Sequence, residues 1–378
     1  MSEMMRLASL RIVTLAGACL GVGYAPPAWA DDPPPVVSVA IRNTLDAWTI
    51  LQGERSQPVV LDRLQVSGTI AFDRIGVDGL SIHAQVFRFS GSSLSERIGD
   101  VQTADAIDTL PVTRLFEAWV EKKWGTRDRS VAVRLGLMDL NADFDSIAAG
   151  SLFINSSHGV GADLARSGLN GPSIYPVSAL GARLNVAPSK RFAIRYALLD
   201  GVAGDSARPR AFVIARLAPR DGTLSIGQMD WRPSEQIHLA LGAWRYSRSA
   251  PTLDGRGRGF RQGLFVEVEK SLTRRLGAWV RVGADDSAVE PVSGYLGAGF
   301  VLKNPFAGRS DDSVGLAVAR AFNSSEARRL KGVEAAETGL ELTYRLAGAA
   351  GFEPAYDGTK NRCLTAWRRP SIRGGGAP

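Results

Sequence analysis

Charged side chains stand between apolar neighbours in several segments of this 378-residue chain. Arg134, for example, lies between Val133 and Leu135. Because successive side chains of a β-strand point to opposite faces, such a charge belongs to a polar face and its neighbours to an apolar one. The residues with this placement are Glu117, Arg134, Arg183, Arg195, Glu267, Arg281, Glu341 and Arg345.

Two other arrangements of reactive side chains do not predict a catalytic site or a metal site. Glu267 and Glu269 share one face of a predicted strand, whereas a glycosidase needs two carboxyl groups opposed across a cleft. His83, His158 and His238 lie far apart in the sequence and lack the spacing of metal ligands. We therefore predict no enzyme, no metal site and no cofactor.

The elements that must position these charges are predicted strands. From Leu64 to Phe72 an apolar residue or glycine occupies every second position, as in a strand with one apolar and one polar face. Segments 45–53 and 327–336 are expected to be short helices or loops. Similar alternation predicts about fourteen strands, each long enough to cross a membrane at a tilt: 64–73, 80–89, 114–123, 131–137, 180–186, 191–198, 211–217, 223–229, 236–245, 260–268, 276–283, 294–302, 313–320 and 337–346.

Alternation alone is compatible with a soluble β-sandwich as well as with a transmembrane barrel. Short turns such as 272–275 alternate with longer connections such as 139–179 and 247–259, which is typical of outer-membrane barrels. We therefore predict an all-β fold, a transmembrane antiparallel β-barrel over residues 61–346. Aromatic residues near predicted strand ends are expected to form interfacial girdles: Trp119, Trp124, Tyr196, Trp231, Trp244, Tyr246 and Tyr344.

The N-terminus has the three parts of a secretory signal peptide. Arg6 and Arg11 precede the apolar segment 12–23, and Ala28-Trp29-Ala30 forms a small-x-small cleavage site. Cleavage after Ala30 removes residues 1–30 and leaves one cysteine, so no internal disulfide can form. Residues 31–60 are expected to be an N-terminal periplasmic segment, with folding into the barrel mouth as the alternative. The net charge of +7 is scattered along the chain and gives no nucleic-acid surface.

The connection after residue 137 contains a specific motif. Gly136-Leu-Met-Asp-Leu-Asn-Ala-Asp-Phe144 is followed by Phe153-Ile-Asn-Ser-Ser157 and then by Tyr175-Pro-Val-Ser-Ala-Leu-Gly181. This run resembles the carbohydrate-selective porin family of Gram-negative outer membranes, the OprB-like porins. The resemblance is specific over residues 136–183 and looser from about residue 64 to residue 346.

The resemblance implies a function and a constriction. Porins of this family are barrels of sixteen strands that pass sugars, here mono- or small oligosaccharides, down their gradient. Carboxylates and guanidinium groups can replace the water shell of a sugar without binding it tightly. The matched motif and strand parity together give the expected channel-lining residues Glu117, Arg134, Asp139, Asn141, Asp143, Asn155, Arg183 and Arg195. For Asp139, Asn141 and Asp143 the alternative is that they only cap and turn the chain where a strand ends.

Two alternatives to a sugar porin stay open at this point. One is a general porin for small solutes, and the other is an exported soluble β-protein that binds or hydrolyses sugars. The expected partners are carbohydrate solutes and outer-membrane lipid, with no nucleic acid. The oligomeric state stays open, with a homo-oligomer as one option.

The C-terminal tail, residues 347–378, departs from the family pattern. Two further amphipathic strands ending on an aromatic residue are expected there, but the tail has no alternating segment of strand length and ends on Pro378. We interpret this as a reading frame that is altered, or a gene that is disrupted, after about residue 346. A barrel lacking its last strands would leave an open edge in lipid, which is costly.

Overall fold

The computed structural model describes residues 12–13, 20–21, 35–50, 58–309, 311–347 and 361–366. The expected cleavage site after Ala30 lies outside the described residues, as does most of the tail 347–378.

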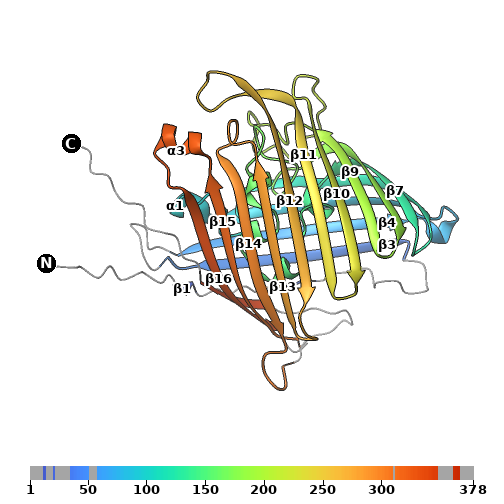
Figure 1. Ribbon diagram of the computed structural model, residues 1–378. Coiled ribbons are helices and arrows are strands. Elements are labelled where there is room, and N and C mark those ends of the chain that lie inside the picture. Colours follow the sequence, from blue (N-terminus) through green and yellow to red (C-terminus); the bar gives the residue numbers. More distant parts are fainter. Residues whose placement is uncertain are drawn as a thin grey trace, which may run out of the picture.

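One antiparallel sheet forms the molecule (Figure 1). Short strands extend its edges: β2 (Leu20–Gly21) pairs with β3, β17 (Asn361–Ala366) with β16, and β1 (Ile12–Val13) with β17. Within the described residues β3 and β16 are not paired with each other, so the sheet is not closed. Its long strands, each paired with the next, are β3 (Val37–Trp48), β4 (Val59–Ala71), β5 (Leu80–Gly91), β6 (Val112–Gly125), β7 (Ser130–Met138), β8 (Ala179–Ser189), β9 (Phe192–Asp200), β10 (Thr223–Ser234), β11 (Ile237–Pro251), β12 (Arg258–Ser271), β13 (Leu276–Asp285), β14 (Val292–Lys303), β15 (Ser313–Asn323) and β16 (Ala336–Ala347).

Helices are short and lie in the connections. No helix of the described chain is long and apolar enough to span a bilayer. The α-helices are α1 (Leu94–Ile98), α2 (Ala162–Ala165) and α3 (Ser325–Lys331), and the 3-10 helices are η1 (Asp73–Ile75), η2 (Leu140–Ala142), η3 (Ala149–Leu152) and η4 (Ser156–His158).

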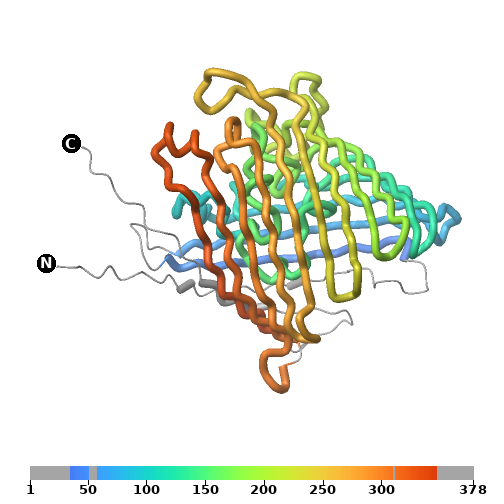
Figure 2. The backbone as a smooth tube through the Cα atoms, viewed as in Figure 1, coloured from blue at the N-terminus to red at the C-terminus, as the bar shows by residue number. Residues whose placement is uncertain are grey.

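The two ends of the sheet differ in the length of their connections. Residues 92–111, 139–178, 201–222 and 324–335 join strands at one end, which we call the long-loop end. Tight turns such as 126–129 and 272–275 join them at the other, the short-turn end. Figure 2 shows the longest connection, residues 139–178 in green, enclosed by the curved sheet. We call it the inner loop.

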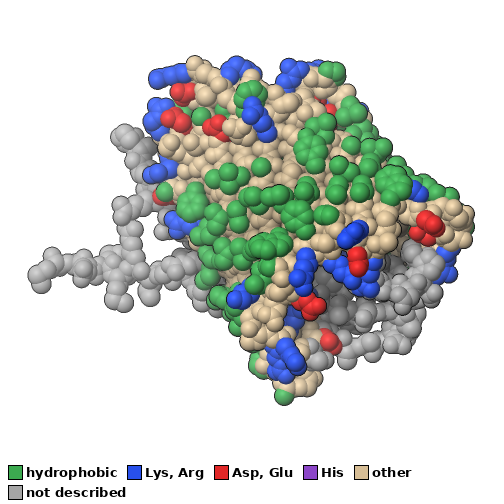
Figure 3. Space-filling view, turned by 45° about the vertical axis from the view of Figure 1, so that its right-hand side comes forward, with side chains coloured by type: hydrophobic (Ala, Val, Ile, Leu, Met, Phe, Trp, Pro, Cys, Tyr) green, Lys and Arg blue, Asp and Glu red, His purple; other side chains and the backbone are tan. Residues whose placement is uncertain are grey.

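The outer face of the sheet carries an apolar belt. On β12 the side chains of Val266 and Val268 are exposed on the outside while Glu267 between them is buried on the inside. On β13 the exposed Val282 follows the buried Arg281 in the same way. Figure 3 shows the resulting band of hydrophobic side chains across the strands. An apolar exterior around a charged interior is the pattern of a membrane barrel and the reverse of a soluble sandwich.

The predicted all-β fold with about fourteen strands is confirmed, but two local errors cancel in that count. Residues 211–217 are not a strand; they lie in the connection 201–222, where the Phe212 carbonyl accepts the Leu115 N–H of β6 at 2.8 Å. The missed strand is β3, which overlaps the expected helix or loop 45–53. The long strands therefore begin at Val37, before the predicted start of the barrel at residue 61.

Two further expectations need correction. The connection expected at 247–259 is mostly strand, because β11 continues to Pro251 and β12 begins at Arg258. The aromatic girdle is only partly present: Trp124, Trp231 and Tyr196 are exposed on the outer face. Trp244 and Tyr246, in contrast, point inward and are buried, because the inner loop packs on them.

Candidate functional site

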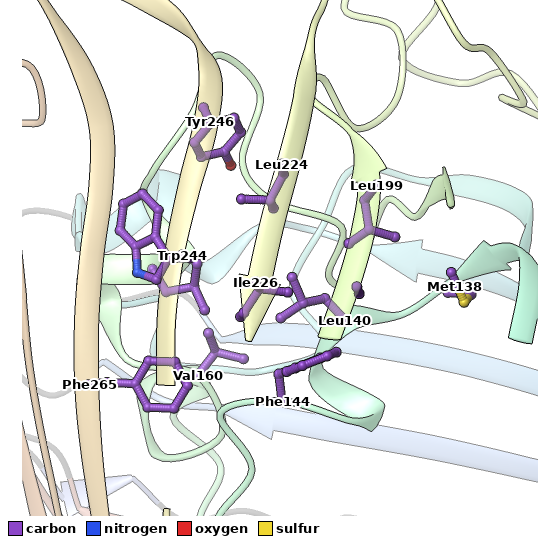
Figure 4. Close-up of a cluster of buried hydrophobic side chains, with 12 residues drawn as sticks. Met138, Leu140, Phe144, Val160, Leu199, Leu224, Ile226, Trp244, Tyr246 and Phe265 are labelled. Atoms are coloured by element: carbon purple, nitrogen blue, oxygen red, sulfur yellow. The ribbon is translucent and has the colours of Figure 1, made fainter. Parts of the chain in front are cut away.

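The inner loop is packed against the inner face of the sheet. Figure 4 shows Leu140, Phe144 and Val160 of the loop against side chains of β9 to β12, including Trp244 and Phe265. A second apolar cluster joins loop residues Ile147, Leu152 and Phe153 to Trp279, Val301 and Ala317 of β13 to β15. Apolar burial of this kind is the main source of loop stability.

Wall side chains also bind the backbone amides of the loop in sequence order. The bonds run from β6 to β10, β12 and β16, so the loop follows the inner wall and occupies the lumen. The bonds are Asp139 N to Glu117 at 3.4 Å, Asp145 N to Gln228 at 3.0 Å, Ala149 N to Glu269 at 3.0 Å, Ile154 N to Glu341 at 2.7 Å and Asn155 N to Glu341 at 3.0 Å.

Arg281 of β13 also binds the inner loop. Its Nε and Nη2 donate to the two carboxylate oxygens of Asp145 at 3.0 and 2.7 Å, and its Nη1 donates to Asp163 of α2. All three side chains are at most 1% exposed. Burial raises the pKa of Asp163, although the nearby Arg281 guanidinium works against this shift. Removing one partner from such a buried network leaves an uncompensated charge, which is strongly destabilising.

A second set of charges forms a row across seven neighbouring strands. We call it the charge belt: Glu121 (β6), Arg134 (β7), Arg183 (β8), Arg195 (β9), Asp230 (β10), His238 (β11) and Glu269 (β12), with Asp143 of the inner loop.

In the first half of the belt, arginines share two carboxylates. Arg134 lies 2.9 Å from Glu121 and 2.9 Å from Asp143. Arg183 lies 2.8 Å from Glu121 and 3.1 Å from Asp143. Arg134 and Arg183 are direct cross-strand partners, so two like charges are held side by side by carboxylates on either side.

In the second half a histidine links two carboxylates. Arg195 donates to Asp230, whose other oxygen lies 2.9 Å from His238 Nε2. His238 Nδ1 lies 3.1 Å from Glu269, which also accepts the Ala149 amide of η3. The belt is thus an unbroken chain of ion pairs and hydrogen bonds.

The belt contains four of the residues predicted from sequence to line the channel. Arg134, Arg183, Arg195 and Asp143 are brought together as described above. Glu117 lies apart and accepts a hydrogen bond from the Trp119 indole at 3.2 Å. The fold therefore brings four of the eight predicted residues together in the charge belt and places the other four outside it.

The other predicted residues cap the inner loop. Asp139 accepts the Asn141 amide at 3.0 Å, and the Asn141 side chain donates to the Asp145 carbonyl at 2.7 Å. Asn155 accepts the Ser157 amide at 2.8 Å at the start of η4. Burial and the neighbouring Glu117 raise the pKa of Asp139 to about 8. The capping alternative therefore describes the contacts of Asp139 and Asn141.

The predicted channel-lining set did not include the belt residues Glu121, Asp230, His238 and Glu269. A signal was present for two of them, since Asp230 and His238 each stand between apolar neighbours. Asp230 was not among the predicted residues because the predicted strand 223–229 ends one residue before it. Glu121 was placed on the polar face of the predicted strand 114–123, but it was not among the expected channel-lining residues.

Two cavities lie on either side of η3. A cavity of about 720 Å³ is enclosed by loop residues 101–108 and 139–177, and Asp139, Asn141 and Asn155 line it. A second cavity of about 440 Å³ opens at the short-turn end between β10 and β16. Ser151, an exposed residue of η3, lines both. The η3 segment of the inner loop therefore lies between the two cavities.

The sequence was compared with known families. It matches the family described as carbohydrate-selective porin, OprB family, over residues 58–350. The chain belongs to this family. The predicted resemblance is thereby confirmed, and no curated protein sequence matches.

Solved porins share the fold. The high pH structure of Pseudomonas putida OprB superposes with a TM-score of 0.70 at 16% identity, covering 88% of this chain and 92% of that one. A triple mutant of Rhodopseudomonas blastica porin gives a TM-score of 0.50 at 12% identity, covering 88% of this chain and 99% of the other. At these identities the likeness concerns the fold.

Family membership and architecture agree on the function. This OprB-family chain is a carbohydrate-selective porin, which implies an outer-membrane location, and the apolar belt fits that location. Family and fold are those of channels rather than enzymes. The alternative of a soluble sugar-binding or sugar-cleaving protein is not favoured.

Proposed function

We propose that mono- and small oligosaccharides cross the lumen through the two cavities and pass η3 at Ser151. The observation that carries this path is that Ser151 lines both the 720 Å³ and the 440 Å³ cavity. A small hydroxyl side chain between the two cavities leaves room for a solute and offers it a hydrogen bond.

The exposed atoms of the charge belt are proposed to contact the sugar. Arg134, Asp143 and Arg195 are 12%, 15% and 21% exposed. They are not among the described residues that line the two cavities, so we propose that they meet the sugar in the lumen beside the inner loop. Partners hold each side chain in place. The side chains therefore offer hydrogen-bond donors and acceptors to a passing sugar hydroxyl without binding the sugar tightly. Glu117, Arg183, Asp139, Asn141 and Asn155, which are more buried or engaged in caps, are proposed to shape this path.

The path is tested by blocking it. Ser151→Trp is expected to slow the swelling of proteoliposomes in glucose and maltose several-fold, because the indole fills the passage between the cavities. Ser206→Trp, in the exposed connection 201–222, is the matched control and is expected to match the wild type. Heat-dependent gel mobility shows whether both proteins are folded. Equal swelling rates for the folded Ser151→Trp variant and the folded wild type would exclude this path.

We also propose export through a cleaved signal peptide. N-terminal sequencing of the protein extracted from the outer membrane is expected to begin at Asp31. A chain that retains residues 1–30 there would contradict cleavage at Ala30. Comparing sugar flux with that of non-sugar solutes of equal size distinguishes the sugar porin from a general porin.

A further inference from the structure

The 440 Å³ cavity at the short-turn end is lined by an excess of basic side chains. Two acidic residues, Glu235 and Glu269, share the lining, and Glu269 is already engaged by His238 and the Ala149 amide. Figure 3 shows basic side chains below the lower margin of the apolar band. The basic residues of the lining are Arg232, Lys270, Arg274, Arg275, Lys303 and Arg345.

These basic groups lack the carboxylate partners that the arginines of the charge belt have. In the described part of the chain, none of the six forms an ion pair, and Arg345 donates only to the Ser313 hydroxyl at 3.4 Å. At the long-loop end, in contrast, Arg216 is paired with Asp221 and Arg329 with Glu326. Charges left unpaired around a concave opening add up to a positive potential at that opening.

We propose that this mouth is an anion-attracting site that favours sugars bearing a carboxylate or phosphate group over neutral sugars. This inference rests on the proposed function, because it assumes that solutes leave or enter through the 440 Å³ cavity. A guanidinium group binds carboxylate and phosphate oxygens in pairs, and several flexible basic side chains hold such a group without a fixed pocket. The attraction is weak and screened by salt, which suits a channel that must release its solute.

The turn that carries Arg274 and Arg275 allows their charge to be reversed without changing its shape. The Thr273 hydroxyl accepts the Arg275 amide at 3.1 Å and the Leu276 amide at 2.9 Å. Both arginine side chains are exposed and take no part in these bonds. The double variant Arg274→Glu plus Arg275→Glu is therefore expected to fold as the wild type does.

The test is the reversal potential of the purified protein in planar bilayers under a potassium chloride gradient. The wild type is expected to favour chloride at 0.1 M salt, and the double variant to lower the chloride-to-potassium permeability ratio by roughly twofold or more. The difference is expected to shrink at 1 M salt. Arg220→Glu plus Arg256→Glu, exposed at the long-loop end, makes the same charge change away from this cavity and is expected to leave the ratio unchanged.

Flux of glucose and of glucuronate into proteoliposomes separates the two proposals. Loss of the glucuronate preference in the double variant, with glucose flux retained, supports the anion site. An unchanged permeability ratio and an unchanged glucuronate-to-glucose ratio in the folded double variant would overturn it while leaving sugar transport intact. Absence of glucose flux in the wild type would instead refute the proposed function.

Discussion

Two groups of arginines face the interior of the same sheet and have different roles. Arg281 is 1% exposed, and Asp145 and Asp163 of the inner loop take up its guanidinium completely. Arg134 and Arg195 of the charge belt also bind the inner loop, at Asp143, but they are 12% and 21% exposed and so keep part of each side chain accessible to solvent. The comparison teaches that a charge inside a barrel is not by itself a solute site: a fully buried one only fastens the loop, whereas a partly exposed one can fasten the loop and also meet a solute.

Breaking the buried group is expected to have the largest effect. Arg281→Met leaves Asp145 and Asp163 buried without their counter-charge, which costs about 3–5 kcal/mol. Urea unfolding in detergent measures this loss. Single-channel conductance is expected to rise as well, because the inner loop loses one of its anchors.

A suitable control replaces an arginine that makes no loop contact. Arg245 lies exposed on the outer face over the Phe260 ring, 4.1 Å from its centroid. Arg245→Met is expected to leave conductance unchanged. If Arg281→Met behaves like this control in both measurements, Arg281 does not anchor the loop.

Acid is expected to weaken the same anchorage through His158. Burial lowers the pKa of the His158 imidazole to about 3. The Glu341 carboxylate lies 3.6 Å away, but it already accepts hydrogen bonds from two amides of the inner loop. A folded pKa below the unfolded value of about 6.5 means that stability is complete above pH 6.5 and lost as the pH falls toward 3.

The expected loss between pH 7.5 and pH 4.5 is about 2–3 kcal/mol from this group. The free energy of unfolding, measured at both pH values in the wild type and in His158→Phe, separates the contribution of His158 from that of other titrating groups. The variant keeps an aromatic ring between Phe153 and Trp279 but has no proton to bind. An equal pH dependence in both proteins would show that His158 is not the titrating group.

Changing the exposed group is expected to affect transport more than stability. Arg134→Gln removes the ion pairs of Arg134 with Glu121 and Asp143, but Arg183 still pairs with both carboxylates, so the expected loss of stability is only about 1 kcal/mol. It also removes donors from the proposed sugar path, so glucose flux at low concentration is expected to fall roughly twofold. A large loss of stability with unchanged flux would place Arg134 with Arg281, as a residue that fastens the loop.

The smallest effect is expected at Asp139. With a pKa of about 8 its carboxyl is mostly protonated at neutral pH, so Asp139→Asn preserves both the charge and the cap on the Asn141 amide. Stability is expected to change by less than about 0.5 kcal/mol, with sugar flux unchanged. A clear change in sugar flux would assign Asp139 to solute contact rather than to capping.

Local periodicity was enough to predict most of the sheet. Strands such as β12 and β13 show their two faces directly, because Glu267 and Arg281 stand between valines. Residues 211–217 form a short apolar run that was also predicted as a strand, yet they lie in a connection and bond β6 through the Phe212 carbonyl. A strand forms only where a neighbour offers a full ladder of hydrogen bonds, and that condition is not local.

The site was predictable only in part, for a related reason. Arg134 and Arg183 were placed correctly on the inner face by parity, but their shared partner Asp143 reaches them through the fold of the inner loop. The bond of Arg281 to Asp145 spans 136 residues, and no spacing rule connects the two. Long-range pairs of this kind depend on how the inner loop packs, which apolar burial decides.

The most direct test of the account addresses the claim that η3 of the inner loop divides the channel at Ser151. Ser151→Cys is placed in a chain whose Cys363 is changed to serine, and a charged thiol reagent is added on one side of a planar bilayer. The account predicts that the reagent lowers single-channel current from either side, because Ser151 lines both cavities. Complete modification of the cysteine with an unchanged current would contradict it.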